Sequence, residues 1–313
     1  MEINYISTLN KILSSMSEVI IGKSEVIIDL IKALIANGHV LIEDVPGVGK
    51  TTFAKSLAKC LDLSFNRIQF TPDLLPTDIT GVSVYNPKTL NFEFKKGPIF
   101  ANLVLADEIN RATAKTQSAL LQVMGENSLT EWNTSYELEP PFMIIATQNS
   151  IEYEGTFRLP EAQLDRFLVK ISIGYPSKDH EEIILKTYRE SDPIDKVKKV
   201  VSKEEVILLQ KKCRQIYVSD KIYKYILDIA YKTRYNSNLI LGVSPRGSLA
   251  LQRIAQASAL ISGRDFVIPE DVKNNVIMTL SHRIIPSQTA LINKFTSEKI
   301  LQDILRSSII PES

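Results

Sequence analysis

The residues best suited to chemistry lie between positions 39 and 52, where the chain reads HVLIEDVPGVGKTT. An apolar strand at Val40–Ile42 is followed by a turn with two glycines, and a helical pattern begins near Lys50. Glycines let the backbone curl so that several N–H groups point inward, and the helix adds its positive dipole end. Lys50 would then reach the β- and γ-phosphates of a nucleotide, and the Thr51 hydroxyl would ligate Mg²⁺. The segment predicts a phosphate-binding loop rather than an ordinary tight turn. The residues assigned to it are Pro46, Gly47, Val48, Gly49, Lys50, Thr51 and Thr52.

The loop departs from the full pattern G-x-x-x-x-G-K-[ST] at its first position, where Asp44 replaces glycine. A carboxylate that pointed into the loop would repel phosphate. We therefore expect the side chain of Asp44 to point outward or to be hydrogen-bonded at the turn.

A second motif, NLVLADEINR at residues 102–111, places two carboxylates at the end of a buried strand. Open parallel sheets bind ligands at this carboxyl edge. Asp107 would hold Mg²⁺ through water, and Glu108 would orient a water for in-line attack on the γ-phosphate. The alternative is a strand that simply turns into solvent. A third strand ends at Asn149, which would contact the attacking water or the γ-phosphate, or else serve as a polar turn residue.

Several arginines are candidates for completing such a site. Arg166, in the run LPEAQLDRF, suits a role in a neighbouring subunit's site, because arginine stabilises developing phosphoryl charge. The alternative is a surface residue. Arg246, at the start of a later helix, could reach back to the nucleotide and couple the second domain to hydrolysis. Arg158 and Arg111 are rivals of Arg166.

These residues need a scaffold of alternating strands and helices, which the apolar patterning predicts up to Pro176. Strands are expected at 40–42, 65–69, 103–106, 143–147 and 168–173, and helices at 5–19, 24–37, 51–60 and 113–124. Such alternation predicts an α/β fold with a parallel sheet covered on both faces. Two β-hairpin insertions are expected, at 81–94 and 128–138. From Asp179 onward only helical periodicity is found, so the chain divides into a core at 1–176 and a helical domain at 177–313.

Composition narrows the function classes. The formal charge of +1 over 313 residues gives no strong field for nucleic acid or an anionic membrane. The two cysteines, Cys60 and Cys213, lie in apolar helical patterns and form no metal site. No signal-peptide pattern or membrane-spanning apolar run is seen, so a cytoplasmic protein is expected.

Taken together, these segments resemble the AAA+ ATPases, and more narrowly the MoxR family, close to the magnesium-chelatase branch. The resembling stretches are GHVLIEDVPGVGKT, RIQFTPDLLPTDITG, FEFKKGPIF, LADEINRATAKTQSALLQVMGE, ATQNSIEYEGTFRLPEAQLDRF, GVSPRGSLAL, RDFVIPEDV and HRI, covering residues 20 to 284. The resemblance puts Lys50 and Thr51 in the Walker A loop and Asp107 and Glu108 at the Walker B pair. It also makes Asn149 the first sensor, Arg166 the arginine finger and Arg246 the second sensor. Ile20 and Ile21 would line the adenine pocket.

The resemblance implies a P-loop AAA+ αβα core with two hairpin insertions and an all-α lid. It implies Mg²⁺-dependent hydrolysis of ATP to ADP in a homo-oligomer, commonly a hexameric ring. Such ATPases act like chaperones that remodel or activate protein partners, often ones with von Willebrand factor A domains. Three alternatives are a nucleic-acid motor of the same fold, a phosphoryl-transfer kinase, and a nucleotide-gated binding scaffold with little turnover. The near-neutral charge argues against nucleic acid. Glu108 argues against the scaffold, but Asp44 at the loop keeps that alternative open.

Overall fold

The fold is taken from a computed structural model, which describes residues 4–131, 134–149, 157–189 and 192–311. Its centre is a five-stranded parallel sheet in the order β2-β5-β8-β1-β9. The strands are β1 (Val40–Asp44), β2 (Phe65–Gln69), β5 (Leu103–Asp107), β8 (Met143–Asn149) and β9 (Val169–Ile171). All five predicted strands are therefore confirmed, with ends that shift by up to two residues.

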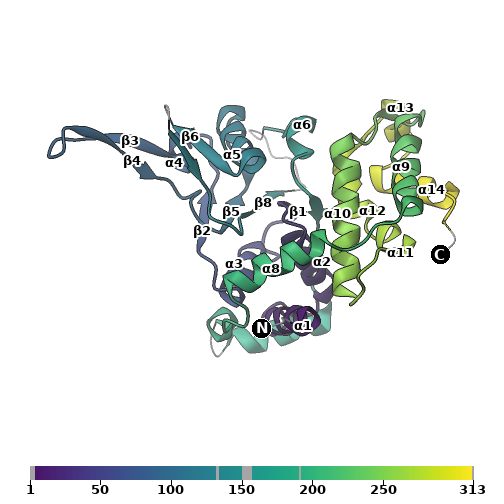
Figure 1. The fold of residues 1–313 in the computed structure, drawn as a ribbon, viewed down its shortest axis with the longest axis horizontal. Helices are drawn as coiled ribbons and strands as arrows, with labels where there is room; N and C mark the ends of the chain where they lie inside the picture. Colours follow the sequence, from purple (N-terminus) through teal and green to yellow (C-terminus); the bar gives the residue numbers. More distant parts are fainter. Residues whose placement is uncertain (1–3, 132–133, 150–156, 190–191, 312–313) are drawn as a thin grey trace.

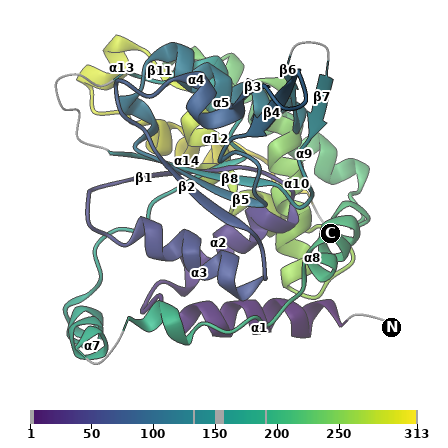
Figure 2. The same cartoon turned by 90° about the vertical axis from the view of Figure 1, so that its left-hand side faces the viewer.

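Alternate residues of each strand enter two different cores, because successive side chains point to opposite faces of a sheet. On β1, Val40 and Ile42 pack with α1 (Tyr5–Ser17), α2 (Ser24–Ile35) and α3 (Lys50–Cys60). Leu41 enters the second core, beneath α4 (Pro76–Thr80) and α5 (Ala114–Glu126). Figure 2 shows the two helical layers on either side of the sheet. This burial on both faces explains why the strands read as continuous apolar runs.

The two predicted hairpins are present. The first joins β3 (Gly81–Asn86) to β4 (Asn91–Lys96), and the second joins β6 (Ser128–Glu131) to β7 (Thr134–Glu137). Phe94 of the first stacks on Tyr136 of the second, with ring centroids 4.5 Å apart. The first hairpin extends well beyond the body of the molecule (Figure 1).

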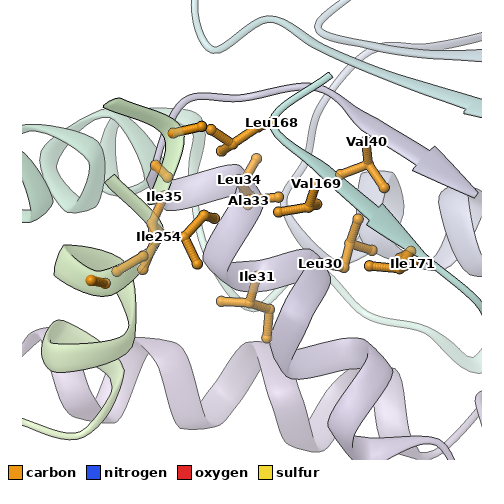
Figure 3. Close-up of a cluster of buried hydrophobic side chains, with 14 of the residues drawn as sticks. Leu30, Ile31, Ala33, Leu34, Ile35, Val40, Leu168, Val169, Ile171 and Ile254 are labelled. Atoms are coloured by element: carbon orange, nitrogen blue, oxygen red, sulfur yellow. The ribbon is translucent and has the colours of Figure 1, made fainter. Parts of the chain in front are cut away.

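The chain after β9 is mainly helical, as predicted. The helices are α6 (Glu161–Leu164), before β9, and then α7 (Lys178–Tyr188), α8 (Lys203–Arg214), α9 (Asp220–Arg234), α10 (Pro245–Ile261), α11 (Pro269–Lys273), α12 (Val276–Leu280), α13 (Gln288–Ile292) and α14 (Ser297–Ser307). Helix α2 lies between β9 and α10, and its Leu30, Ile31, Leu34 and Ile35 fill that space (Figure 3). Helix α10 thus packs against the sheet through α2.

Two details of the helical region differ from expectation. The helical periodicity of residues 269–280 corresponds to two short helices, α11 and α12, because residues 274–275 form a turn between them. The region is also not purely helical, since β10 (Leu239–Leu241) pairs with β11 (Ile285–Pro286). Strands of three and two residues are too short to give a periodic signal in sequence.

Candidate functional site

The glycine-rich loop joins the carboxyl end of β1 to the first turn of α3. Gly47 and Gly49 have φ of +86° and +85°, a conformation that glycine adopts without steric penalty. Within the described residues, the N–H groups of these two glycines donate no hydrogen bond. Together with the free N–H groups of the first helical turn, they form a set of donors suited to an anion.

Lys50 is buried at the base of this loop. Its Nζ donates to the carbonyl oxygens of Asp44 at 2.7 Å and Gln148 at 3.3 Å, and to Oδ1 of Asn149 at 3.2 Å. Burial lowers the pKa of Lys50 below its ordinary value, and the neighbouring carboxylates offset this only in part. Phosphate oxygens beside the ammonium would therefore stabilise its charged form.

Asp44 does not point into the loop. Its Oδ2 accepts hydrogen bonds from the N–H groups of Ile173 and Gly174, both at 2.6 Å, and from the Ser172 hydroxyl at 3.1 Å. Its Oδ1 accepts from the N–H of Val45 at 2.8 Å. Burial raises the pKa of Asp44, but these donors outweigh it and the net pKa is lowered. The expectation that Asp44 is hydrogen-bonded at the turn is confirmed, and this carboxylate ties β1 to the segment after β9.

The two acids after β5 are held in different ways. Oδ1 of Asp107 accepts from the Thr147 hydroxyl at 2.6 Å, and Oδ2 accepts from Nε and Nη2 of Arg67 at 3.1 and 2.6 Å. Asp107 is thus fixed by β2 on one side and β8 on the other.

Glu108 has a left-handed backbone, with φ of +56°. Its side chain accepts hydrogen bonds from Gln69 Nε2 at 3.0 Å, Arg111 Nη1 at 3.0 Å and Asn149 Nδ2 at 3.3 Å. Lys50, Asp107, Glu108 and Asn149 are therefore brought together at one sheet edge, as the sequence predicted. Arg111, a candidate trans-acting arginine, contacts the Glu108 of its own chain.

A cavity of about 490 Å³ opens beside the loop. The lining includes Ile20, Ile21, Pro46, Gly47, Val48, Gly49 and Thr52, which are seven of the nine residues assigned to nucleotide binding. Opposite them lie Ile173–Pro176 and one side of α7, including Ile184 and Tyr188. The cavity is mostly apolar and ends at the loop, as a base-and-sugar pocket next to a phosphate site would.

The donor set fits a magnesium nucleotide. The described residues contain no cluster of three or more His, Cys, Asp or Glu able to enclose a metal by themselves. Mg²⁺ in phosphate-handling sites is held by only one or two protein oxygens, the rest coming from phosphates and water. Thr51, at the first turn of α3, and Asp107 would supply those protein oxygens.

A second cavity, of about 440 Å³, contains Arg166 and Arg246. We call it the arginine pocket, because Arg166, Arg214, Arg246, Arg253 and Arg283 all line it. His39, Phe142 and Leu168, which directly precede β1, β8 and β9, also line it. The arginine pocket therefore lies at the amino ends of the strands, whereas the loop and the acids lie at the carboxyl ends.

This placement differs from the expectation that Arg246 reaches back to the nucleotide of its own chain. The two cavities share no lining residue. Along β8 alone, the six residue steps from Met143 to Asn149 span about 20 Å. Arg166 is held in the arginine pocket by a hydrogen bond from Nη1 to the carbonyl oxygen of Leu121 at 2.6 Å. Arg158 is exposed on the segment before α6.

Sequence reasoning missed three residues of these sites. Arg67 and Gln69 reach Asp107 and Glu108 from β2, and their alternation on one face of a strand was the available signal. Asp165 adjoins Arg166 in sequence, but its partners lie 79 and 118 residues away. Nothing local in the sequence could have identified those partners.

Comparison with known proteins agrees with the site and the fold. Residues 39–169 match the model of the ATPase family associated with various cellular activities (AAA), and residues 231–304 match the AAA lid domain. Among the described residues, none of the helices combines the length and apolar character needed to cross a membrane.

Three similar proteins cover nearly the whole chain. The uncharacterized protein YeaC of Bacillus subtilis is 48% identical over 97% of this chain and 95% of its own. Chaperone MoxR1 of Mycobacterium tuberculosis is 37% identical over 98% of this chain and 83% of its own. A crystal structure of a protein from Cytophaga hutchinsonii, assigned as an ATPase, superposes with a TM-score of 0.91 and 39% identity, covering 98% of this chain and 96% of that one. The chain belongs to the MoxR family of AAA+ ATPases.

Proposed function

We propose that this protein hydrolyses ATP with Mg²⁺ at sites shared between copies of the chain. Lys50 and the loop N–H groups bind the β- and γ-phosphates, and Thr51 and Asp107 hold Mg²⁺, which neutralises charge on the phosphates. Glu108 orients the attacking water, and Asn149 contacts that water or the γ-phosphate. Ile20 and Ile21 line the adenine pocket.

The placement of the arginines carries the proposal that sites are shared. Arg166 and Arg246 lie at the amino ends of the strands, about a full strand length from the loop of their own chain. Within the arginine pocket, the side chains of Arg214, Arg246 and Arg253 make no hydrogen bond or ion pair with the described residues. Such a concentration of positive charge is suited to the triphosphate of a neighbouring copy. A closed ring, most simply a hexamer, lets each copy both donate and receive arginines.

The energy released by ATP hydrolysis would be used to remodel or activate a partner protein. The first hairpin supports this, because it projects from the core and exposes Tyr85, Leu90 and Phe92 near its end. Exposed apolar side chains on a projecting element are typical of a protein contact. A partner with a von Willebrand factor A domain is our specific expectation, and a cytoplasmic location goes with it.

Steady-state ATPase turnover across protein concentration tests the proposal. We would measure wild type, Glu108→Gln, Arg166→Ala, and an equal mixture of the two variants. The expected result is turnover that rises with concentration, two variants inactive alone, and recovery in the mixture, where a Glu108→Gln copy donates Arg166 to an intact site. Concentration-independent turnover with an active Arg166→Ala variant would contradict sharing. ATP binding without turnover in the assembled wild type would support the scaffold alternative.

A further inference from the structure

Asp165 joins the core to the helical region at the arginine pocket. Its Oδ2 accepts a hydrogen bond from the Ser244 hydroxyl at 2.9 Å, and its Oδ1 accepts from Nε of Arg283 at 2.8 Å. Asp165 directly precedes Arg166, and Ser244 lies two residues before Arg246. A single carboxylate therefore connects the backbones that carry the two candidate trans-acting arginines.

Ser244 is well placed to transmit this contact. It is the N-cap of α10, where its hydroxyl also accepts from the N–H of Gly247 at 3.1 Å. Arg246 is the second residue of that helix. Fixing the cap therefore fixes the first turn of α10 and the point from which the Arg246 side chain departs.

Arg283 makes the other half of the connection rigid. Its side chain is 2% exposed and also donates to the carbonyl oxygens of Leu168 at 3.0 Å, Phe167 and Thr279. Burial lowers the pKa of Arg283 to about 10, with Asp165 opposing the shift, so the guanidinium stays charged at neutral pH. Breaking a pair with so buried a charge is strongly unfavourable.

The Arg166 side chain is confined as well. A Cβ added at Gly125 would lie 2.3 Å from Nη1 of Arg166, so α5 approaches the guanidinium closely. Both ends of the arrangement are thus held: the side chain of Arg166 by α5, and its backbone neighbour by α10 and Arg283.

We propose that Asp165 is a positioning residue that fixes Arg166 and Arg246 relative to each other, so that one copy presents both to its neighbour as a rigid pair. The inference rests on the proposed function, because it assumes that the arginines act on another copy's nucleotide. Under this proposal, the contact between the core and the helical region belongs to the surface that presents the arginines to a neighbouring copy (the arginine-donating face). It does not belong to the surface that carries the glycine-rich loop and the acids (the ATP-binding face). Asp165 itself contacts no nucleotide.

Complementation between variants tests the assignment to a face. The Asp165→Asn variant keeps an intact glycine-rich loop, Asp107 and Glu108. Assayed without a second variant, it should hydrolyse ATP about 10- to 100-fold more slowly than wild type, because its arginines are misplaced. Mixed with Glu108→Gln it should recover, because the Glu108→Gln copy offers an intact arginine face. Mixed with Arg166→Ala it should not recover, since both copies lack that face. Affinity for a fluorescent ATP analogue, measured on each variant, should equal that of wild type.

Ser244→Gly provides a second variant that perturbs the fold less. Glycine is nearly as good an N-cap as serine, so the helix start is largely kept while the hydroxyl bond to Asp165 is lost. It should fall in the same complementation class as Asp165→Asn, and Ser244→Thr, which keeps the hydroxyl, should retain turnover.

Asp271→Asn is the matched control, because Asp271 is a buried carboxylate paired with Arg264 by two bonds of 2.7 Å, outside the arginine pocket. It should lower the melting temperature without joining either complementation class. The inference is overturned if Asp165→Asn and Ser244→Gly behave like Asp271→Asn, or if Arg166→Ala rescues Asp165→Asn. If Glu108→Gln and Arg166→Ala fail to rescue each other, the proposed sharing of sites fails first, and the two failures are distinguishable.

Discussion

Two sites of this chain, at opposite ends of the strands, are opposite in chemistry. The first, which we call the loop pocket, is the apolar cavity beside the glycine-rich loop together with the buried Lys50 and the acids Asp107 and Glu108 at the same ends of the strands. The arginine pocket has five arginines and a single acid, Asp165, already engaged by Ser244 and Arg283. The loop pocket has groups suited to a magnesium nucleotide and a water, and the arginine pocket carries a net positive charge. Each site lacks the charged groups that the other provides, as expected of two surfaces that contact each other between neighbouring copies of the chain.

The difference also shows where control of the reaction would lie. The loop pocket is built by residues near one another on adjacent strands of one chain, and the proposed reaction adds only the arginines of a neighbouring copy. The arginine pocket depends on how the helical region packs against the amino ends of the strands. Any partner that shifts this packing would alter catalysis in the neighbouring copy without touching the nucleotide.

The largest expected effect comes from the arginine pocket. Arg166→Ala should reduce turnover about 10³-fold, because a trans-acting arginine stabilises charge that develops on the transferred phosphoryl group. The measurement is the maximal rate of ATP hydrolysis at saturating Mg·ATP and high protein concentration. Arg306→Ala, which removes an exposed arginine from α14, is the control and should change little. Equal rates of ATP hydrolysis for the two variants would show that the arginine pocket does not take part in catalysis.

The next effect belongs to the loop pocket. Glu108→Gln should reduce turnover about 10²-fold while ATP stays bound, because the amide keeps the shape but cannot polarise the water. Isothermal titration with ATP and Mg²⁺ should show an affinity close to wild type. Glu126→Gln, at the exposed end of α5, serves as the control. A variant that loses both binding and turnover would show that Glu108 supports the loop and does not act on water.

The loop pocket could be predicted almost completely from sequence, and the arginine pocket could not. Lys50, Asp107 and Asn149 each end or follow an apolar strand, and the ends of parallel strands meet at one edge by geometry alone. The location of Arg246 depends instead on contacts such as Ser244–Asp165, 79 residues apart. Local patterns fix the strands and helices, but they do not fix which edge of the sheet the helical region covers.

A third prediction separates structure from binding inside the loop pocket. Asp44→Asn should destabilise the fold by about 2 kcal/mol, because an amide has one acceptor to offer where a carboxylate takes four donors. The measurement is urea unfolding at neutral pH. Since the pKa of Asp44 is lowered in the folded state, its contribution is present above its unfolded pKa near 3.9 and is lost in more acidic solution. Asp62→Asn, which breaks an exposed pair with Lys199, is the control and should change the stability much less than Asp44→Asn does.

The smallest predicted effect concerns His39, which lines the arginine pocket. His39 is buried before β1, where its Nδ1 accepts from the N–H of Ile144 at 3.0 Å and its Nε2 donates to the carbonyl oxygen of Met124 at 3.1 Å. Burial lowers the pKa of His39 to about 4, with the bond to Met124 opposing the shift. Between about pH 6.5 and pH 4 the unfolded chain therefore binds a proton that the folded chain does not.

Stability should accordingly fall as the pH drops below about 6.5, by about 1 kcal/mol between pH 6.5 and 5.5 from this one group. Replacing His39 with glutamine, which can donate and accept without titrating, should reduce the slope of that part of the profile in urea unfolding, and the rest of the slope would come from His282, whose pKa burial also lowers. An unchanged slope in His39→Gln would mean that another group carries the acid sensitivity. Because His39 packs under the arginine pocket while the acids of the loop pocket lie at the opposite strand ends, the same variant should leave nucleotide affinity unaltered.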